Sequence, residues 1–267
     1  MIYTLENNIA IIKIDTYACE IASFKRKDKD IEYMWNGDPK YWANRNPLLF
    51  PHVSAPTSKI LNFKGKDYKV NNHGFARKSE FKFIENTDNS LLFELESNEE
   101  TLKEYPYQFR LLVKYTLIQN KVIIEYEVIN IDKQDIYFGF GQHPAFNCPL
   151  DSDKKFNDYY IEFEEDDVDN RKLELSYELF DKYPTYIIKN PKSKIFTLSD
   201  GNNKVIMHVD DKYKIFAIWT PKAPFICLEP WVNTLDKNDL DTPFENRDVI
   251  CLEKGNKYQI KYDFEIV

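Results

Sequence analysis

The sequence predicts an all-β protein whose strands form a sandwich or a barrel, and three observations support this. Tyrosine and phenylalanine are abundant, at 18 and 19 of 267 residues, whereas glycine occurs only 7 times. Aromatic side chains fit the pleated, half-buried surface of a strand. Apolar and polar residues alternate in many short segments, and convincing helical periodicity over a dozen residues is absent. Many short strands with closely spaced turn signals are typical of sandwiches and barrels.

The clearest pattern is a long antiparallel hairpin. Apolar residues recur at every second position in residues 109–117 and 122–129, and a short polar segment at residues 119–121 joins the two stretches. Further strands are expected at residues 81–84, 91–95, 160–163, 205–209, 215–219 and 258–266. Residues 173–180 are the best candidate for a short helix.

Nothing in the sequence divides the chain. It has no linker rich in Pro, Ser or Gly and no fixed-period repeat, so residues 1–267 are expected to form a single domain. The net charge of −8 and the lack of a basic stripe argue against nucleic acid as a partner. The chain begins with a strand-like segment, without a leader or an apolar run that could span a bilayer. We therefore expect a cytoplasmic monomer or homodimer with no membrane partner.

Three segments interrupt the alternation and are expected to be loops, at residues 42–56, 71–77 and 141–150. A β-sandwich carries function on such loops, because the scaffold fixes them while their side chains stay free. His143 follows an apolar strand and precedes Pro144. An imidazole fixed there suits a general acid. A turn histidine that caps a backbone carbonyl is an equally good interpretation of the pattern.

The other histidines have less informative surroundings. His73 precedes Gly74, which permits an unusual backbone turn, and Arg77 follows in the same segment. Arg77 could pair with an anion or bind hydroxyls, but a surface arginine at the start of a strand fits as well. His52 is consistent with loop structure or with the rim of a site. His208 lies within an apolar strand and is expected to be structural.

Glu229 is the second candidate for chemistry. It follows an apolar strand and precedes Pro230 and Trp231. A carboxylate in that position is costly unless it is paired or functional, and partial burial would raise its pKa towards that of a useful base. The alternative is an exposed glutamate at the end of a strand. Trp231 and Trp219 offer flat faces for the C–H surface of a sugar, although tryptophan more often packs in a core.

Other site types are poorly supported. The histidines show no HxxxH or HxH spacing, so no metal site is expected. A GxSxG motif, a Walker loop and a reactive-cysteine context are all missing. The cysteines form no CxxC pair and have apolar or strand-like neighbours, which predicts buried free thiols at Cys19, Cys148, Cys227 and Cys251.

Four motifs together resemble those of the aldose 1-epimerase (galactose mutarotase-like) family. In chain order they are N-R-N-P-L-L-F-P at residues 44–51, H-G-F-A-R at 73–77, G-Q-H-P-A-F at 141–146 and E-P-W at 229–231. Their order and wide spacing match the family over essentially the whole chain. The resemblance implies a large, curved antiparallel β-sandwich that binds a sugar in a groove on its concave face.

The resemblance also implies an activity, the interconversion of the α and β anomers of an aldohexose. Glu229 would remove the proton of the C1 hydroxyl, and His143 would protonate the ring oxygen as the ring opens. His73 and Arg45 would hydrogen-bond the developing charge or the ring hydroxyls. No metal or organic cofactor is required, and the partner is a small sugar.

Two points of the resemblance leave the substrate open. The better-known galactose enzymes of the family carry a further substrate-binding aspartate. No motif places it in this sequence, where Asp200 and Asp236 are guesses. Arg77 and Arg45 together also resemble relatives that act on hexose 6-phosphates, since arginine binds phosphate in a bidentate manner.

Two other classes of protein remain as alternatives. A non-catalytic carbohydrate-binding or sugar-sensing domain would keep Trp231, Trp219 and Arg45 but would not need both His143 and Glu229. A lyase or hydrolase with this fold would usually have extra domains and often a tyrosine-based site. The joint presence of His143 and Glu229 favours the epimerase.

Overall fold

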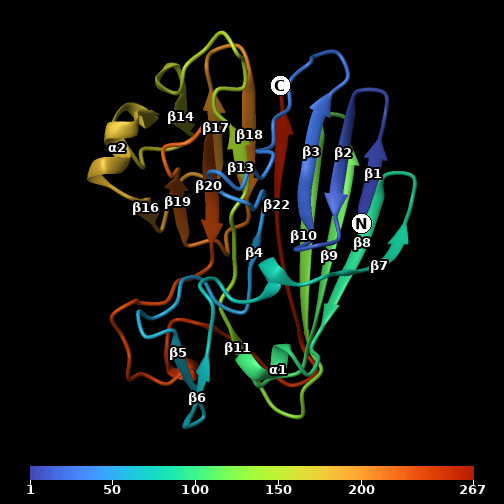
Figure 1. The fold of residues 1–267 in the computed structure, drawn as a ribbon, viewed down its shortest axis with the longest axis vertical. Coiled ribbons are helices and arrows are strands. Elements are labelled where there is room, and N and C mark those ends of the chain that lie inside the picture. The colour runs from blue at the N-terminus through green and yellow to red at the C-terminus, as the bar shows by residue number, and fades with distance from the viewer.

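A computed structural model describes residues 1–267 and consists mainly of antiparallel strands in two layers (Figure 1). One layer is a nine-stranded sheet. The other is made of a three-stranded and a six-stranded sheet that lie side by side over it. Aromatic contacts join the layers, including Phe24 with Phe264 and Phe196 with Phe216. The predicted antiparallel β-sandwich is therefore confirmed.

The nine-stranded sheet forms the continuous layer. Its strands, in spatial order, are β15 (Lys172–Glu174), β14 (Tyr160–Phe163), β17 (Ile195–Ser199), β18 (Lys204–Val209), β22 (Lys257–Ile266), β10 (Lys121–Asn130), β9 (Phe109–Ile118), β8 (Ser90–Glu96) and β7 (Lys82–Asn86).

The opposite layer has two parts. The three-stranded sheet contains β1 (Ile2–Glu6), β2 (Ala10–Asp15) and β3 (Glu20–Arg26). The six-stranded sheet follows the order β16 (Tyr186–Lys189), β19 (Ile215–Trp219), β20 (Phe225–Trp231), β12 (Gly141–Gln142) and β4 (Leu48–Leu49), with β13 (Ala145–Asn147) also paired to β20.

Smaller elements complete the chain. Two-stranded ribbons are formed by β5 (Ile60–Phe63) with β6 (Lys66–Lys69), and by β11 (Ile136–Phe138) with β21 (Ile250–Leu252). The short helices are α1 (Thr101–Glu104), α2 (Tyr177–Lys182) and the 3₁₀ turns η1 (Ala76–Lys78), η2 (Phe156–Asp158), η3 (Asp169–Arg171) and η4 (Phe244–Asn246). No helix has both the length and the apolar character that a membrane crossing requires.

The predicted hairpin is formed by β9 and β10, which pair without a break from Phe109 opposite Asn130 to Ile118 opposite Lys121. The apolar residue at every second position is buried on both strands. Because side chains of a strand alternate between its faces, one face enters the core and the other meets solvent. Each of the other predicted strands also overlaps a strand of the structure.

Some predictions were wrong in detail. The segments at residues 42–56 and 141–150 contain the short strands β4, β12 and β13, which are nearly all buried and too brief to show alternation. Only the second half of the predicted helix at residues 173–180 is helical, because Ser176 caps α2 by accepting a hydrogen bond from the Leu179 amide. Cys251 is exposed rather than buried, because β21 turns one face of its ribbon to solvent.

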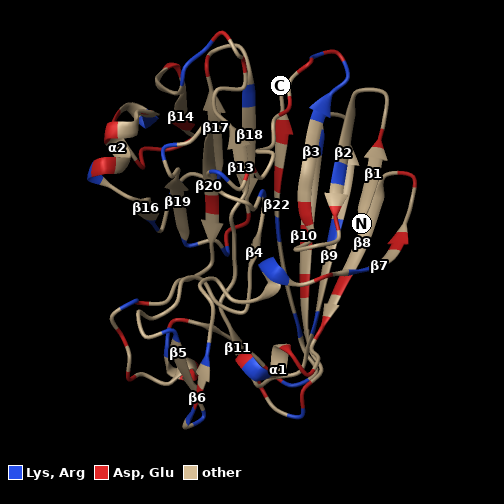
Figure 2. Cartoon of the chain, in the orientation of Figure 1, with Lys and Arg blue, Asp and Glu red and all other residues tan.

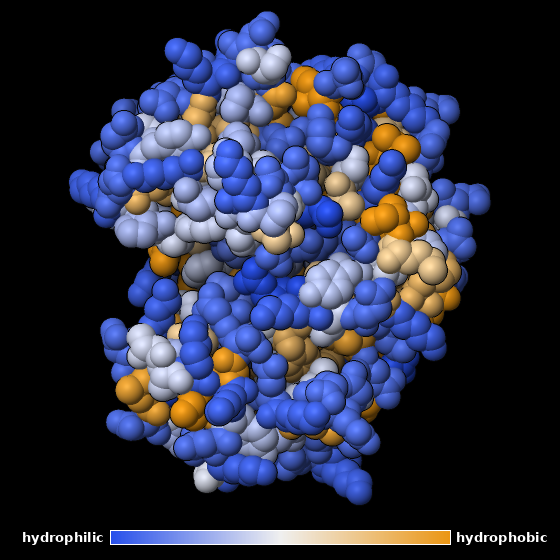
Figure 3. Space-filling model, in the orientation of Figure 1, coloured by the Kyte–Doolittle hydropathy of each residue, from blue (hydrophilic) through white to orange (hydrophobic).

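Charged residues are distributed over the whole molecule. Lys and Arg are interspersed with Asp and Glu along strands and outer loops (Figure 2). The surface is correspondingly hydrophilic over most of the face in Figure 3, with scattered apolar patches. The same view is hollowed on its left side, between the part with α2 and β16 and the part with β5 and β6.

Gly74 joins two of the loops that the sequence singles out. Its φ of +69° is left-handed, and it forms a parallel bridge with Phe50. A Cβ at this position would lie 2.2 Å from the Phe50 carbonyl oxygen, too close for any L side chain. This packing explains why glycine precedes Phe75 in the H-G-F-A-R motif.

Gly74→Ala is therefore expected to destabilise the protein by about 2 kcal/mol or more, through left-handed strain plus a backbone clash. Urea denaturation measures the loss. Gly255→Ala is the matched control, because Gly255 has a φ of +75° and a Cβ added there would meet no atom within 4 Å. Equal losses in the two variants would show that the contact with Phe50 has no importance.

Candidate active site

A cavity of about 270 Å³ brings the predicted residues together. Five of the six site residues proposed from the sequence line it, namely His73, Arg77, His143, Glu229 and Trp231. The remaining lining residues are Trp42, Ser54, Asn72, Thr185, Trp219 and Lys237. A larger hollow of about 450 Å³ lies over the nine-stranded sheet, but charged side chains such as Lys114 and Glu125 line it, without histidine or tryptophan. The smaller cavity is thus the candidate site.

Glu229 is placed in the cavity by the alternation of β20. All seven residues of this strand are buried, so neither face shows a polar pattern. Ile226 and Leu228 enter the main core, whereas Cys227 and Trp231 lie in small clusters on the other face. Glu229 belongs to that second face by the same period of two. Burial raises the pKa of the Glu229 carboxyl well above its usual value, which favours the protonated form.

His143 lies opposite Glu229 because the flanking strands set the register. Gly141 pairs with Trp231 and Ala145 pairs with Cys227, so residues 143 and 229 fall at the same position of the ladder. His143 Nε2 is 3.2 Å from Glu229 Oε2. Both side chains are almost fully buried. The turn histidine and the exposed glutamate of the alternative interpretations are therefore excluded by the structure.

The charge state of His143 is also set by its surroundings. Burial lowers the pKa of its imidazole well below the usual value, and the nearby His73 and Arg77 act in the same direction. His143 Nδ1 is buried without a hydrogen-bond partner. Glu229 Oε2 also has no hydrogen-bond partner, so the 3.2 Å contact joins a neutral imidazole and a protonated carboxyl that need only a small reorientation to pass a proton between them.

His73 contributes a neutral donor to the cavity. The Ser54 amide donates to His73 Nδ1 at 3.1 Å, which leaves the proton on Nε2. Burial, aided by the charge of Arg77, lowers the pKa of His73 to about 3. His52 is buried behind this loop, with Nδ1 2.6 Å from the Ser54 carbonyl, so it belongs to the loop structure rather than to the site.

Aromatic rings form the walls of the cavity. The Trp42 indole stacks on the His143 imidazole, with ring centroids 4.8 Å apart and planes at 30°. The Trp219 ring lies nearly perpendicular to the same imidazole, with ring centroids 5.5 Å apart and planes at 80°. The sequence did not predict Trp42 and Lys237 as site residues. Both lie in loops, where no periodic pattern indicates which side chains face a site.

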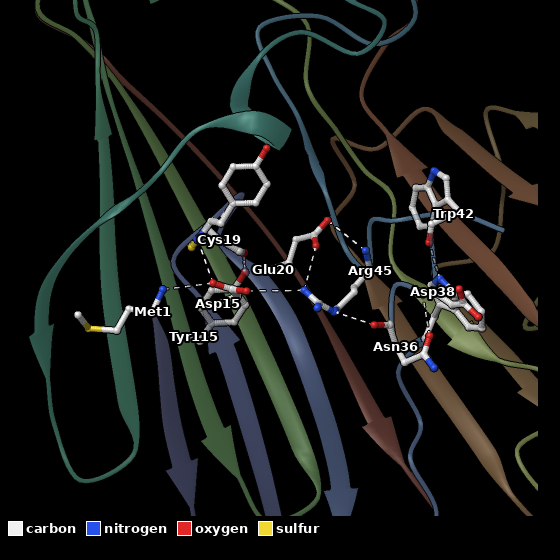
Figure 4. A network of polar contacts seen from close by, with 11 residues as sticks. Met1, Asp15, Cys19, Glu20, Asn36, Asp38, Trp42, Arg45 and Tyr115 are labelled. Atoms are coloured by element: carbon white, nitrogen blue, oxygen red, sulfur yellow. Dashed lines mark hydrogen bonds and ion pairs between the residues drawn. The ribbon is translucent and has the colours of Figure 1, made fainter. Parts of the chain in front are cut away.

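Arg45 does not line the cavity. Its guanidinium lies 3.7 Å from Asp15 and 3.8 Å from Glu20, and its Nε donates to the Asn36 carbonyl at 3.2 Å. The expected contact with substrate therefore has no support in the geometry. The physical reason is that the Arg45 side chain is directed towards the carboxylates of Asp15 and Glu20, at the ends of β2 and β3 (Figure 4).

The candidate aspartates also lie outside the lining. Asp200 accepts a hydrogen bond from the Tyr159 hydroxyl at 2.9 Å and holds the turn at Asn203. Asp236 accepts from the amide of Asn238 within its own turn. Glu229 is therefore the single carboxylate in the cavity lining.

A metal ion would need Cys227 as well as the proposed pair. The donor atoms of His143, Cys227 and Glu229 lie within 4.8 Å of one another. Cys227 does not line the cavity, and burial raises the pKa of its thiol, which disfavours the thiolate that zinc binds. The arrangement as it stands does not fit such an ion.

The fold and the site geometry agree with comparisons to known proteins. The family described as "Aldose 1-epimerase" matches residues 1–265 of this chain. The chain belongs to the aldose 1-epimerase family. A similar protein is Protein LacX (chromosomal) of Lactococcus lactis subsp. lactis, which is 33% identical over 264 residues, covering 86% of this chain and 87% of LacX.

Solved structures show the same fold as this member of the family. A galactose mutarotase related enzyme from Lactobacillus acidophilus superposes with a TM-score of 0.92 at 30% identity, covering 100% of this chain and 97% of that one. A galactose mutarotase-like protein from Lactobacillus casei ATCC 334 gives a TM-score of 0.92 at 26% identity, with both chains covered completely. The family and the fold class predicted from the sequence are thus confirmed.

Proposed function

We propose that this protein is an aldose 1-epimerase that interconverts the α and β anomers of an aldohexose, with His143 and Glu229 as the proton-transfer pair. The observation that carries the proposal is the contact of 3.2 Å between His143 Nε2 and Glu229 Oε2 inside a cavity with tryptophan walls. Ring opening needs one group that takes a proton and another that gives one, on two oxygens bonded to the same carbon.

The reaction begins with the proton of the C1 hydroxyl, which passes to the Glu229 carboxylate. The C1–O1 bond becomes a carbonyl, the C1–O5 bond breaks, and His143 gives its proton to O5. Rotation about C1–C2 then presents the other face of the aldehyde. For reclosure the roles reverse, since Glu229 now holds the proton that His143 lost, and the pair returns to its initial state.

The resting charge state is consistent with this cycle. The pair with neutral His143 and protonated Glu229 differs from the ion pair only by the transfer of one proton across their contact. Arg77 lines the same cavity, and its positive charge lowers the pKa of Glu229 against the larger effect of burial. Hydroxyl groups of a bound sugar would add donors to the carboxylate and favour its ionised form further.

The sugar would be held by neutral donors and aromatic faces. His73 presents Nε2–H as a hydrogen-bond donor, as derived from its contact with Ser54. Trp231 and Trp219 provide flat surfaces on which the C–H groups of a pyranose can pack, whereas Trp42 stacks on His143 and Phe225 instead. A cavity of about 270 Å³ has room for one monosaccharide rather than for a chain of sugars.

The proposal is tested by polarimetry or NMR exchange on freshly dissolved α-anomers of glucose, galactose and glucose 6-phosphate. The protein should accelerate equilibration of at least one of them over the buffer rate. If a sugar binds but none equilibrates faster, the protein is a sugar-binding domain and the epimerase proposal is wrong.

A second candidate substrate, a hexose 6-phosphate, is favoured by one specific feature. Arg77 and Lys237 both line the cavity, and Glu229 is the single carboxylate among the lining residues. With Glu229 protonated, the cavity carries a net positive charge that suits a phosphate group.

Lys237→Met separates the two substrates. If a phosphorylated sugar is the substrate, this variant is expected to raise KM for glucose 6-phosphate about tenfold, because it removes one charged contact with the phosphate. KM for glucose should not change. Progress curves for the two α-anomers give both constants. An equal change for both sugars would argue against a phosphate subsite.

A further inference from the structure

His143 lacks the hydrogen bond that usually orients a catalytic histidine. Its Nδ1 is buried without a partner, and its other nitrogen faces Glu229. The orientation of the ring must therefore come from packing. The Trp42 indole covers one face of the imidazole at 4.8 Å, and it also stacks on Phe225, with planes at 19°.

Trp42 belongs to a loop, residues 36–46, that contains no strand or helix. Within the loop, the amides of Tyr41 and Trp42 both donate to the Asp38 carbonyl. The Trp35 indole donates to the Trp42 carbonyl at 2.8 Å. These bonds define the turn around Trp42. They also link it to the six-stranded sheet, because the Trp35 amide donates to the Ala145 carbonyl on β13, but they do not attach the loop to β2 and β3.

Arg45 supplies that attachment. Its Nε donates to the Asn36 carbonyl at the start of the loop, while its amide donates to Glu20 Oε1 at 3.1 Å. The guanidinium lies between Asp15 and Glu20 on one side and Asn36 on the other (Figure 4). Because one side chain contacts both the loop and two strands, it restricts how far the loop can move from the sheet.

The loop is packed tightly against this arginine. Gly37 has a φ of +77°, and a Cβ there would lie 3.2 Å from both Cγ and Nε of Arg45. The backbone continues the connection to the catalytic segment, because the Arg45 carbonyl accepts a hydrogen bond from the Ala145 amide at 2.8 Å. Ala145 is two residues beyond His143 on β13.

We infer that Arg45 is a positioning residue for the proposed reaction, which clamps the 36–46 loop to β2 and β3 and so holds the Trp42 indole against the His143 imidazole. The expected effect on kcat rests on the proposed function. The clamp, by which we mean the contacts of Arg45 with residues 36–46 and with β2 and β3, is a structural property and does not depend on it. Arg45 thus acts through Trp42 rather than by contact with the sugar.

The test is a double-mutant cycle in the full-length protein with Arg45→Ala, Trp42→Ala and the double variant. Each single change is expected to lower kcat about tenfold with little change in KM, because a misplaced imidazole slows proton transfer. The double variant should be no slower than Trp42→Ala alone, since both changes remove the same contact. A raised KM in Arg45→Ala would show that Arg45 contacts the substrate. Effects of the two changes that multiply would show that Arg45 does not act through Trp42. Either result overturns the inference.

Hydrogen exchange provides a readout that does not depend on activity. In Arg45→Ala the amides of Tyr41 and Trp42 should exchange faster, and in the control Arg26→Ala they should not. Arg26 pairs with Asp28 at the other end of β3. Unchanged protection in Arg45→Ala overturns the clamp even if the protein proves inactive on every aldose. If Arg45→Ala does not fold, Arg45→Lys keeps the charge but cannot bridge both partners, and the same loss of protection is expected.

Discussion

Glu229→Gln is expected to lower kcat for anomer exchange by about 10²–10⁴-fold, the usual contribution of one proton-transfer group. The amide has the shape of the protonated carboxyl that burial favours at this position, so the cavity should keep its geometry. It cannot accept the C1 proton. KM should change little, because the sugar still meets the same walls and donors.

The same variant should be more stable than the wild-type protein at neutral and alkaline pH. In the unfolded chain Glu229 ionises with an ordinary pKa, near the reference value of 4.5, whereas burial keeps it protonated in the folded protein. Folding above that pH therefore requires uptake of a proton, and the penalty grows with pH until the folded pKa is reached. Glutamine removes this penalty, so the gain in stability should be larger at pH 8 than at pH 5.

Polarimetry measures the rate of the variant, and thermal unfolding at the two pH values measures its stability. Glu127→Gln is the control, since Glu127 lies on β10 in an ion pair with Lys257, away from the cavity. Near-full activity in Glu229→Gln would overturn the assignment of Glu229 as the base. A stable but inactive variant would instead show that function and stability conflict at this residue.

The parts of the fold that could be predicted from the sequence are those with one buried face. β9 and β10 alternate because one side of the hairpin enters the core and the other meets solvent. β20 is buried on both faces, so its residues show no alternation of polar and apolar side chains. In the sequence only Glu229 and the E-P-W motif drew attention to this segment. β4 and β12, at two residues each, are below the length at which any pattern is visible.

The site shows a similar division. His143 and Glu229 could be proposed from their local surroundings, but their contact depends on the register of β12 and β13 against β20, which no local pattern encodes. Arg45 stands in a motif that indicates substrate binding, yet the carboxylates of Asp15 and Glu20 bind its side chain instead. Such competition between partners is decided by tertiary distances, and a sequence pattern cannot reveal it.

His143→Asn should lower kcat by about 10²–10⁴-fold as well, because asparagine cannot give a proton to O5. The pH profile of the wild-type protein distinguishes the role of this histidine from a purely structural one. Burial, aided by the nearby His73 imidazole and by the charge of Arg77, keeps the pKa of His143 well below its ordinary 6.5. His143 and Glu229 together therefore take up a further proton only at a pH well below 6.5. The plot of kcat/KM against pH should show no inflection at pH 6.5.

The matched control is His208→Asn. His208 lies on β18, where its Nδ1 is 2.7 Å from Asp263 Oδ1 on the neighbouring β22. This variant should retain the wild-type rate, since His208 is not among the residues that line the cavity. An inflection at 6.5 in the wild-type profile would mean that His143 titrates as an exposed histidine, which is incompatible with its burial against Trp42 and Glu229. A loss of rate in His208→Asn equal to that in His143→Asn would show that the kinetic effect reflects unfolding rather than chemistry.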